Sequence, residues 1–495
     1  MNSGNMQDFF KGKTVLVTGA TGFLAKVFVE KILRIQPEIQ KLYLLLRASN
    51  SDMAAHRLQN EVFEIDLFRV LRAELSEDFN SFISKKVVAI AGDVAIENLG
   101  IKDEKLKNEI LEEIDVLVHS AASTKFDDRF DILMGVNTKG ALHALNFAKN
   151  CQKLKAFVHI STAYVCGNAK YEDGIVREKA FEMGQSLKKT SNLDIHTEMK
   201  LLDNKIAELQ AMNADENTMK FALKDYGMER LSKFAWPNTY VFTKAMGEML
   251  LMHHKDNVPL IIIRSTMVTS TIKDPFPGWI EGVRTIDGVI YNYGIGKLKS
   301  FVGNPKTILD VIPADMVINC VIAAIFIHSK QPPKNFIYHV SSSLRNPLKY
   351  CDISKFCHSY FKKTPCINQN GKPIVISNPC LVNSFVAFDI YIKVTHVLPL
   401  KVLSLVNKIC HHSFQDVYDK KSRKLRMMHR LATLYKPYVY FMFVFDDKNT
   451  EILRMAAKGG PKMDNVELNF DPTIIDWIEY MMNIHIPGLV KYQMK

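Results

Sequence analysis

The chain has 495 residues, of which 47% are hydrophobic and 23% charged, and this favours a globular protein with more than one domain. Lys and Arg outnumber Asp and Glu by 12, an excess that favours anionic partners such as a phosphorylated ligand or anionic lipid. Nucleic acid is not an expected partner, because no Lys/Arg tract contains interleaved aromatic residues. The eight cysteines form no Cys-x-x-Cys pair and no zinc spacing, so neither disulfides nor a metal site is predicted.

Targeting and membrane-spanning segments are not expected either. The first five residues are polar and a strand pattern begins by Thr14, which argues against a secretory signal and a plastid transit peptide. The longest apolar run, residues 316–327, is too short for a membrane span and contains Asn319. Residues 381–406 are apolar but interrupted by charges, so we expect them to attach to a membrane surface. These features predict a cytoplasmic protein bound peripherally to the endoplasmic reticulum membrane.

Short apolar runs alternate with helix-like stretches through the first two thirds of the chain. The first run, Thr14-Val-Leu-Val-Thr18, is rich in β-branched residues, as a buried parallel strand should be. Further runs occur at residues 42–46, 87–90, 116–119, 157–160 and 260–263. This alternation predicts an α/β fold with a doubly wound parallel sheet of the Rossmann type, covered by helices on both faces.

The alternation of strands and helices ends within the chain, and this predicts the domain boundaries. Residues 1–345 hold the alternating pattern and form the predicted cofactor-binding domain, with a charged helical insert near residues 178–233. Residues 346–380 are punctuated by Asn346-Pro347, Lys372-Pro373 and Asn378-Pro379 and are predicted to connect two domains. Residues 381–495 show mainly helical patterns and form a smaller predicted C-terminal domain. Four apolar side chains of the insert repeat at helical spacing: Met199, Leu202, Ile206 and Leu209.

A glycine-rich loop follows the first predicted strand. Its sequence, Thr18-Gly19-Ala20-Thr21-Gly22-Phe23-Leu24-Ala25, opens an amphipathic helix. Small residues let the backbone approach a pyrophosphate, whose charge faces the helix N-terminus. Ala25 stands where the third glycine is usual, and the helix–strand packing at that position tolerates it. Because the loop joins a strand to a helix, dinucleotide binding is a better interpretation than a structural turn.

Three charged residues bear on the choice of dinucleotide. Arg47 closes the second strand, where NAD-selective folds place an acidic residue for the ribose 2′-hydroxyl, and a cation there suits a 2′-phosphate. Arg57 lies in the next helical stretch and is a second candidate for this contact. Asp93 follows the third strand, where it would reach the adenine edge. NADPH is therefore the expected cofactor, although a solvated charge at Arg47 is the alternative.

The candidate reaction centre combines a strand end with a helix. Tyr240 and Lys244 are four residues apart, a spacing that puts both side chains on one helix face. An ammonium beside a phenol favours the phenolate, so Lys244 is expected to lower the pKa of Tyr240 and ready it as a general acid. Ser161 and Thr162 end the fifth predicted strand and supply a hydroxyl that could polarise a carbonyl.

The order of these motifs resembles that of extended short-chain dehydrogenases. Longer segments are similar to alcohol-forming fatty acyl-CoA reductases of the plant type, also called male-sterility-like proteins, and the resemblance covers nearly the whole chain. These segments are Trp236-Pro-Asn-Thr-Tyr240, Pro275-Phe-Pro-Gly-Trp279-Ile-Glu-Gly282, Asp310-Val-Ile-Pro-Ala-Asp315, Phe445-Asp-Asp-Lys-Asn-Thr450-Glu-Ile-Leu453 and His485-Ile-Pro-Gly488. Ser265 departs from the family, which usually has proline there, and the loss of a fixed φ is expected to loosen the loop beside the nicotinamide.

The resemblance implies an enzyme of lipid metabolism, such as wax biosynthesis, that reduces a long-chain fatty acyl-CoA to the primary alcohol through an aldehyde-level intermediate. It implies Thr162 as the catalytic hydroxyl, with Ser161 as the alternative, Tyr240 as the acid and Lys244 as its partner cation. It also implies a set of cofactor contacts: Gly19, Thr21, Gly22, Phe23, Leu24, Arg47, Asp93, Ala121, Tyr240 and Lys244. The residues by themselves argue only for carbonyl reduction with NADPH.

Three other functions compete with this one. A nucleotide-sugar epimerase shares the catalytic residues but normally retains NAD, and Arg47 argues against it. Another NADPH-dependent carbonyl reductase, acting on a hydroxysteroid or a flavonoid, gives no reason for the insert and the second domain. A non-catalytic NADP-binding protein would have no need of Tyr240 and Lys244.

Two other features have less specific interpretations. Cys166 lies four residues past Thr162, but no base pairs with it in the sequence, so a core cysteine is expected rather than an acyl-accepting nucleophile. A basic cluster is either a solvated helix face or a contact for coenzyme A phosphates or a membrane surface. Its members are Lys420, Lys421, Arg423, Lys424, Arg426 and Arg430.

Overall fold

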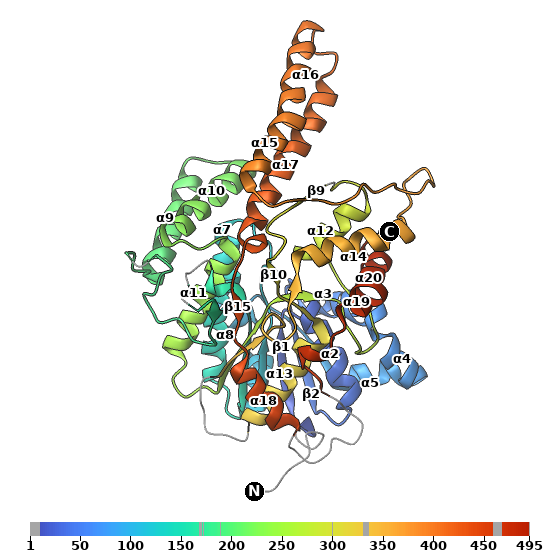
Figure 1. Ribbon diagram of the computed structural model, residues 1–495. Helices are drawn as coiled ribbons and strands as arrows, with labels where there is room; N and C mark the ends of the chain where they lie inside the picture. The colour runs from blue at the N-terminus through green and yellow to red at the C-terminus, as the bar shows by residue number, and fades with distance from the viewer. Residues whose placement is uncertain are drawn as a thin grey trace.

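A computed structural model of the chain describes residues 10–167, 171, 173–188, 190–298, 300–329, 336–458 and 468–494. The N-terminal residues on which the absence of a targeting segment was argued, and the side chain of Arg430, lie outside this part. Seven parallel strands form the central sheet in the order β12-β7-β5-β4-β1-β2-β3 (Figure 1). Their bounds are β1 Thr14–Thr18, β2 Lys41–Leu46, β3 Val87–Ala91, β4 Val116–His119, β5 Ala156–Thr162, β7 Leu260–Ser265 and β12 Phe336–Val340.

The sheet confirms the predicted doubly wound α/β fold. Six of its strands coincide with the apolar runs of the sequence, and β12 is an additional strand at the edge beside β7. The order in which strands are added to the sheet reverses beside β1, which pairs with β2 on one side and with β4 on the other. In such sheets a crevice opens at this switch point, outside the carboxyl ends of the strands.

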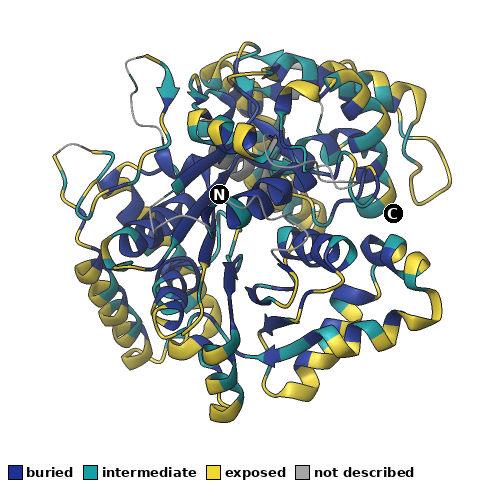
Figure 2. Cartoon of the chain, turned by 90° about the horizontal axis from the view of Figure 1, so that it is seen from below, coloured by how far each residue is buried: buried dark blue, intermediate teal, exposed yellow. Residues whose placement is uncertain are grey.

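Helices cover both faces of the sheet, so most apolar side chains of its strands are buried in both directions (Figure 2). On one face α2 (Phe23–Ile35) contacts α13 (Ala314–His328), and on the other lie α6 (Glu104–Glu113) and α8 (Gly140–Lys149). Helix α13 contains the longest apolar run of the sequence, which is thus explained as core. Its Asn319 donates a hydrogen bond to the carbonyl of Asn469 at 2.7 Å.

The charged insert forms two helices, α9 (Ile195–Ala211) and α10 (Glu216–Phe234). Leu202 and Leu209 of the predicted stripe are buried. A buried ion pair between Glu198 and Arg230, at 2.5 Å, joins the two helices. The residues before Ile195 belong to no helix in the described part of the insert, so the helical portion is shorter than the sequence pattern suggests.

The last third of the chain is mainly helical. Helix α14 (Tyr350–Lys363) lies inside the predicted connecting region and buries one apolar face. A long hairpin follows, made of α15 (Phe385–Ile392), a π-helical turn (Lys393–Val397), α16 (Leu398–Ile409) and α17 (Gln415–Val439), and it projects from the body (Figure 1). The chain ends with α18 (Lys448–Lys458), α19 (Trp477–Glu479) and α20 (Ile486–Gln493).

Within the described residues, we find no helix of sufficient length and hydropathy to traverse a bilayer.

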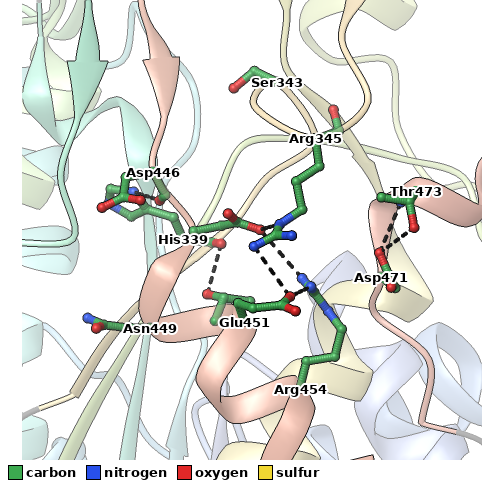
Figure 3. A network of polar contacts seen from close by, with 12 residues as sticks. His339, Ser343, Arg345, Asp446, Asn449, Glu451, Arg454, Asp471 and Thr473 are labelled. Atoms are coloured by element: carbon green, nitrogen blue, oxygen red, sulfur yellow. Dashed lines mark hydrogen bonds and ion pairs between the residues drawn. The ribbon is translucent and has the colours of Figure 1, made fainter. Parts of the chain in front are cut away.

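The C-terminal part is fastened to the sheet by a polar cluster (Figure 3). Strand β15 (Val444–Phe445) pairs with β6 (Ile175–Val176), and α18 packs against α13 and β12. Arg345 donates to Asp447 at 2.5 Å, and Arg454 lies between Asp447 and Glu451. Thr450 donates to the carbonyl of His339 at 3.0 Å. The family-like segment from Phe445 to Leu453 therefore holds the C-terminal part of the chain against the sheet.

A second set of contacts gives a structural role to two more of the family-like segments, residues 275–282 and 485–488. Gly278 has φ +84° and lies against Gly488 of α20. A Cβ atom on Gly488 would come within 2.0 Å of the Gly278 carbonyl oxygen, so only glycine allows this backbone contact. The buried His485 ring lies 3.1 Å from the Ser270 hydroxyl and also 3.1 Å from Asp287. These segments hold the end of the chain against the sheet.

Candidate active site

A cavity of about 660 Å³ opens at the carboxyl ends of β1, β4, β5 and β7. Its wall includes all four residues predicted for catalysis and half of those predicted for the cofactor: Gly22, Phe23, Leu24, Ser161, Thr162, Tyr240 and Lys244. Gly19, Thr21, Arg47, Asp93 and Ala121 lie outside this wall. They belong to the neighbouring edge formed by the ends of β1 to β4.

The glycine loop has the geometry of a phosphate-binding turn. Gly19 has φ +69°, and a Cβ atom there would lie 2.6 Å from the Ala121 Cα atom, so a side chain would push apart the loops after β1 and β4. Gly22 is the N-cap of α2 and brings no side chain to the helix terminus. The first turn of α2 contains no acidic residue. Its free N–H groups and positive dipole end fit an anion such as a dinucleotide pyrophosphate.

The end of β2 carries the predicted selectivity residue. Arg47 is two-thirds exposed, and its Nε atom lies 3.4 Å from Asp93, at the end of the neighbouring β3. Asp93 also accepts a hydrogen bond from the backbone N–H of Ala95 at 2.9 Å. Arg57 is engaged differently: it pairs with Glu61 at 2.6 Å and donates to the Arg47 carbonyl. Of the two arginines, Arg47 retains the freer guanidinium.

Helix α11 (Thr239–His254) presents Tyr240 and Lys244 to the cavity. Its N-cap is Asn238, whose side-chain oxygen accepts from the backbone N–H of Val241 at 3.0 Å. The Asn238 amide also donates to the hydroxyl of Tyr438 at 2.7 Å. Trp236 donates to the carbonyl of Val165 at 3.0 Å. The family-like segment before Tyr240 thus anchors the helix that carries the reaction centre.

The expected lowering of the Tyr240 pKa is not observed. Burial raises the pKa of Tyr240 to about 12, although Arg284 acts in the opposite direction. Burial also lowers the pKa of Lys244 to about 8, against the attraction of Glu248. The Lys244 ammonium donates to the carbonyl of Ile160 at 2.7 Å and lies 3.4 Å from the His159 ring. Tyr240 is therefore protonated at neutral pH, which is the form that a general acid requires.

The two hydroxyls at the end of β5 are in different environments. Ser161 donates to Glu248 at 2.5 Å, and Glu248 forms a buried ion pair with Arg264, also at 2.5 Å. Thr162 accepts a hydrogen bond of 3.3 Å from the backbone N–H of Tyr164. No acceptor for the Thr162 hydroxyl proton is found among the described residues. This proton is available to a ligand, whereas that of Ser161 is committed to Glu248.

Aromatic side chains that the sequence analysis did not identify form one wall of the cavity. Phe126 stacks on Tyr240 with ring centroids 5.8 Å apart and on Tyr438 at 5.6 Å. Tyr164 meets Tyr438 edge-on at 5.0 Å. Tyr435 and Tyr438 come from α17, so this C-terminal helix supplies part of the cavity wall. Lys125 and Arg284 add two cations to the lining.

The structure shows that Cys166 is a core residue and that Ser265 is part of a regular strand. Cys166 is buried, is absent from the cavity wall, and burial raises its pKa to about 12, so it is no thiolate nucleophile. Ser265 lies at the cavity as the last residue of β7, where it is paired with Thr162 and Val340. The strand continues through Ser265, so the loosening expected from the missing proline is not apparent in the backbone.

Comparison with known proteins decides the family. A family model described as "Male sterility protein" matches residues 17–321, and a second with the same description matches residues 395–495. The chain is 48% identical over 490 residues to "Alcohol-forming fatty acyl-CoA reductase" from Simmondsia chinensis, with 99% of each chain covered. The chain belongs to the fatty acyl-CoA reductase family.

Other members of the family are similar to this chain over most of its length, and solved structures share its fold. "Fatty acyl-CoA reductase 1" of Arabidopsis thaliana is 47% identical, with 99% of each chain covered. "Fatty acyl-CoA reductase 2" of Homo sapiens is 30% identical over 98% of this chain and 86% of its own length. The reductase domain of a nonribosomal peptide synthetase from Mycobacterium tuberculosis superposes with a TM-score of 0.57 at 17% identity, covering 97% of this chain and 91% of that one. At that identity the likeness concerns the fold alone.

Proposed function

We propose that this chain reduces long-chain fatty acyl-CoA to the primary alcohol with NADPH and releases coenzyme A. The observation that carries the proposal is the meeting of Tyr240, Lys244 and Thr162 in one cavity beside an open helix N-terminus. The full-length relatives are named for fatty acyl-CoA reduction. The aromatic wall suits an apolar chain, and the positive charge of Lys125 and Arg284 suits the phosphates of coenzyme A.

The residues of the cavity can carry out two successive carbonyl reductions. A nicotinamide dinucleotide, bound anew for each round, would supply one hydride to each of them. Thr162 donates a hydrogen bond to the substrate carbonyl oxygen, and the Tyr240 phenol transfers its proton to that oxygen. The Lys244 ammonium stabilises the phenolate left on Tyr240. The first round gives a hemithioacetal, which expels coenzyme A as its thiol and leaves an aldehyde; the second round gives the alcohol.

The experiment for this function uses the purified full-length chain. It is incubated with NADPH and acyl-CoAs of graded chain length, and the products are identified by mass spectrometry. We expect the primary alcohol, free coenzyme A and two NADPH oxidised per alcohol formed. Reduction of steroid or flavonoid carbonyls without reduction of acyl-CoA would favour the competing carbonyl-reductase function.

The choice of NADPH over NADH rests on Arg47 at the end of β2. In an Arg47→Asp variant, KM for NADPH should rise by about 10–100-fold, because a charge-assisted contact contributes about 1.5–3 kcal/mol. KM for NADH should change little, since NADH lacks the 2′-phosphate. Steady-state kinetics with both cofactors test this, and Arg57→Asp, whose guanidinium is already paired with Glu61, should raise KM for NADPH much less. Equal losses with NADPH and NADH would contradict the assignment.

The different surroundings of the two strand-end hydroxyls give a paired prediction. Thr162→Val keeps the shape of the side chain but removes the donor, so kcat should fall by about 100-fold, as for the loss of one oxyanion donor. Ser161→Ala should lower kcat much less, because its hydroxyl is bonded to Glu248. The two variants are compared by NADPH oxidation with acyl-CoA. The reverse order of the two effects would assign the role to Ser161.

We further propose that residues 1–345 and 381–495 are the two functional parts of the chain, joined by residues 346–380. The matches of the two family models, to residues 17–321 and 395–495, support this division. We also propose a peripheral location on the cytosolic face of the endoplasmic reticulum. Alkaline carbonate should release the chain from isolated membranes, and its retention in the pellet would contradict peripheral attachment.

A further inference from the structure

The reaction described above gives no role to the projecting helical hairpin. We call residues 385–426 the helical arm. Residues 385–409 form one continuous helical rod, and the chain turns at residues 410–414 and returns along α17 (Figure 1). At 1.5 Å per residue the rod is about 37 Å long. Asn407 closes the turn, donating to Gln415 at 2.7 Å and accepting from the N–H of Phe414 at 2.8 Å.

Exposed apolar side chains gather on the helical arm. Of the 27 exposed large hydrophobic residues in the described part of the chain, 11 lie between Val386 and Val417. Seven of them follow one face of the rod at intervals of three or four residues and are 56–71% exposed: Val386, Ile390, Val394, Leu398, Val402, Leu405 and Ile409. Phe388 and Ile392, on another face, are buried. An apolar stripe of this length is not left in water without a partner.

The charge of the helical arm indicates what this partner is. Residues 385–426 contain eight Lys and Arg and three Asp, a net charge of +5. Lys401, Lys408, Lys420, Lys421 and Lys424 are exposed. An apolar stripe next to a basic face is the arrangement of helices that lie in the interface of a bilayer with anionic lipids. Nucleic acid would use the charge but leave the stripe uncovered.

We propose that the helical arm inserts its apolar stripe into the surface of an anionic phospholipid bilayer, with the lysines at the lipid phosphates. The arm continues into the cavity wall, because Tyr435 and Tyr438 lie near the end of the same helix α17. Binding would therefore bring the mouth of the cavity to the membrane, where long-chain acyl groups partition. This last consequence rests on the proposed function, whereas the binding itself does not.

The test is flotation of the full-length chain with vesicles of phosphatidylcholine alone or with 30% phosphatidylserine. The stripe variant is Val402→Gln/Leu405→Gln/Ile409→Gln, and its partitioning should fall by about 100-fold. The charge variant is Lys401→Gln/Lys408→Gln/Lys420→Gln/Lys424→Gln, and it should lose about fivefold per charge on the anionic vesicles only. Met455→Gln/Ile474→Gln/Ile478→Gln removes three equally exposed apolar side chains elsewhere and should float like the wild type.

Two controls make each outcome decisive. All variants should keep the thermal unfolding midpoint and the rate of NADPH oxidation with a short, monomeric acyl-CoA in the absence of vesicles. A stripe variant that floats like the wild type would overturn the proposal. So would a wild-type dimer that ignores vesicles and dissociates in the stripe variant, since the stripe would then bind a second copy. If the wild type floats, the stripe variant does not, and neither reduces acyl-CoA, the result would support membrane binding by the helical arm and contradict the proposed function.

Discussion

A Tyr240→Phe variant should lose about 10²–10⁴-fold in kcat with acyl-CoA, the range that general acid catalysis contributes. The substitution removes the proton donor and keeps the ring, whose centroid lies 5.8 Å from that of Phe126. NADPH should still bind with nearly the affinity of the wild type, followed by fluorescence, because the phenol is not expected to hold the pyrophosphate. The measurement is NADPH oxidation over a range of substrate concentrations.

Lys244→Ala is the companion variant for this experiment. It should lower kcat to a similar extent, and the double variant should be far from additive, because both residues serve one proton transfer. Lys244 is buried and donates to the Ile160 carbonyl at 2.7 Å, so a thermal melt should accompany the kinetics. A Tyr240→Phe enzyme that turns over within a few-fold of the wild type would remove Tyr240 and Lys244 from the mechanism.

The second large effect concerns stability. Arg264→Met should reduce the free energy of unfolding by about 3–5 kcal/mol, because it leaves the buried Glu248 carboxylate without its cation. The two side chains are 2% and 1% exposed and lie 2.5 Å apart. Arg264 also donates to the carbonyl of Lys179 at 2.9 Å. Urea unfolding, followed by circular dichroism, measures the change.

An exposed ion pair provides the matched control. Lys205 and Glu208 lie 2.8 Å apart on α9, with side chains 30% and 47% exposed. Lys205→Met should change the free energy of unfolding by no more than about 1 kcal/mol, since exposed pairs contribute little. Equal effects of Arg264→Met and Lys205→Met would show that burial of the Glu248–Arg264 pair has no energetic consequence.

The parallel sheet could be predicted from the sequence because its strands are short, apolar runs separated by helices. The glycine loop was predicted for the same reason: a strand, small residues and a helix follow one another in the chain. Strand β12 was not predicted. Its sequence, Phe-Ile-Tyr-His-Val, contains a buried histidine, and only its pairing with β7 makes it part of the sheet.

The rest of the site depends on contacts between distant residues. Asn238 and Tyr438 are 200 residues apart in the chain, yet they share a hydrogen bond at the cavity. No local pattern indicates such a contact, so the aromatic wall was missed. The pKa of Tyr240 was predicted in the wrong direction for a related reason. Spacing along a helix reveals the neighbouring Lys244 but not the burial that raises the pKa to about 12.

The hydrogen bond between Asn238 and Tyr438 bears on how this chain can be engineered. Asn238 ends the segment that fixes α11, and Tyr438 belongs to the C-terminal helices. The cofactor-binding portion expressed alone would lack the part of the cavity wall that α17 supplies. Phe126, Tyr164 and Tyr240 would then face solvent there. The two portions are therefore not interchangeable modules. A chimera made from two relatives would need crossover positions that take Asn238, Phe126 and Tyr438 from the same relative.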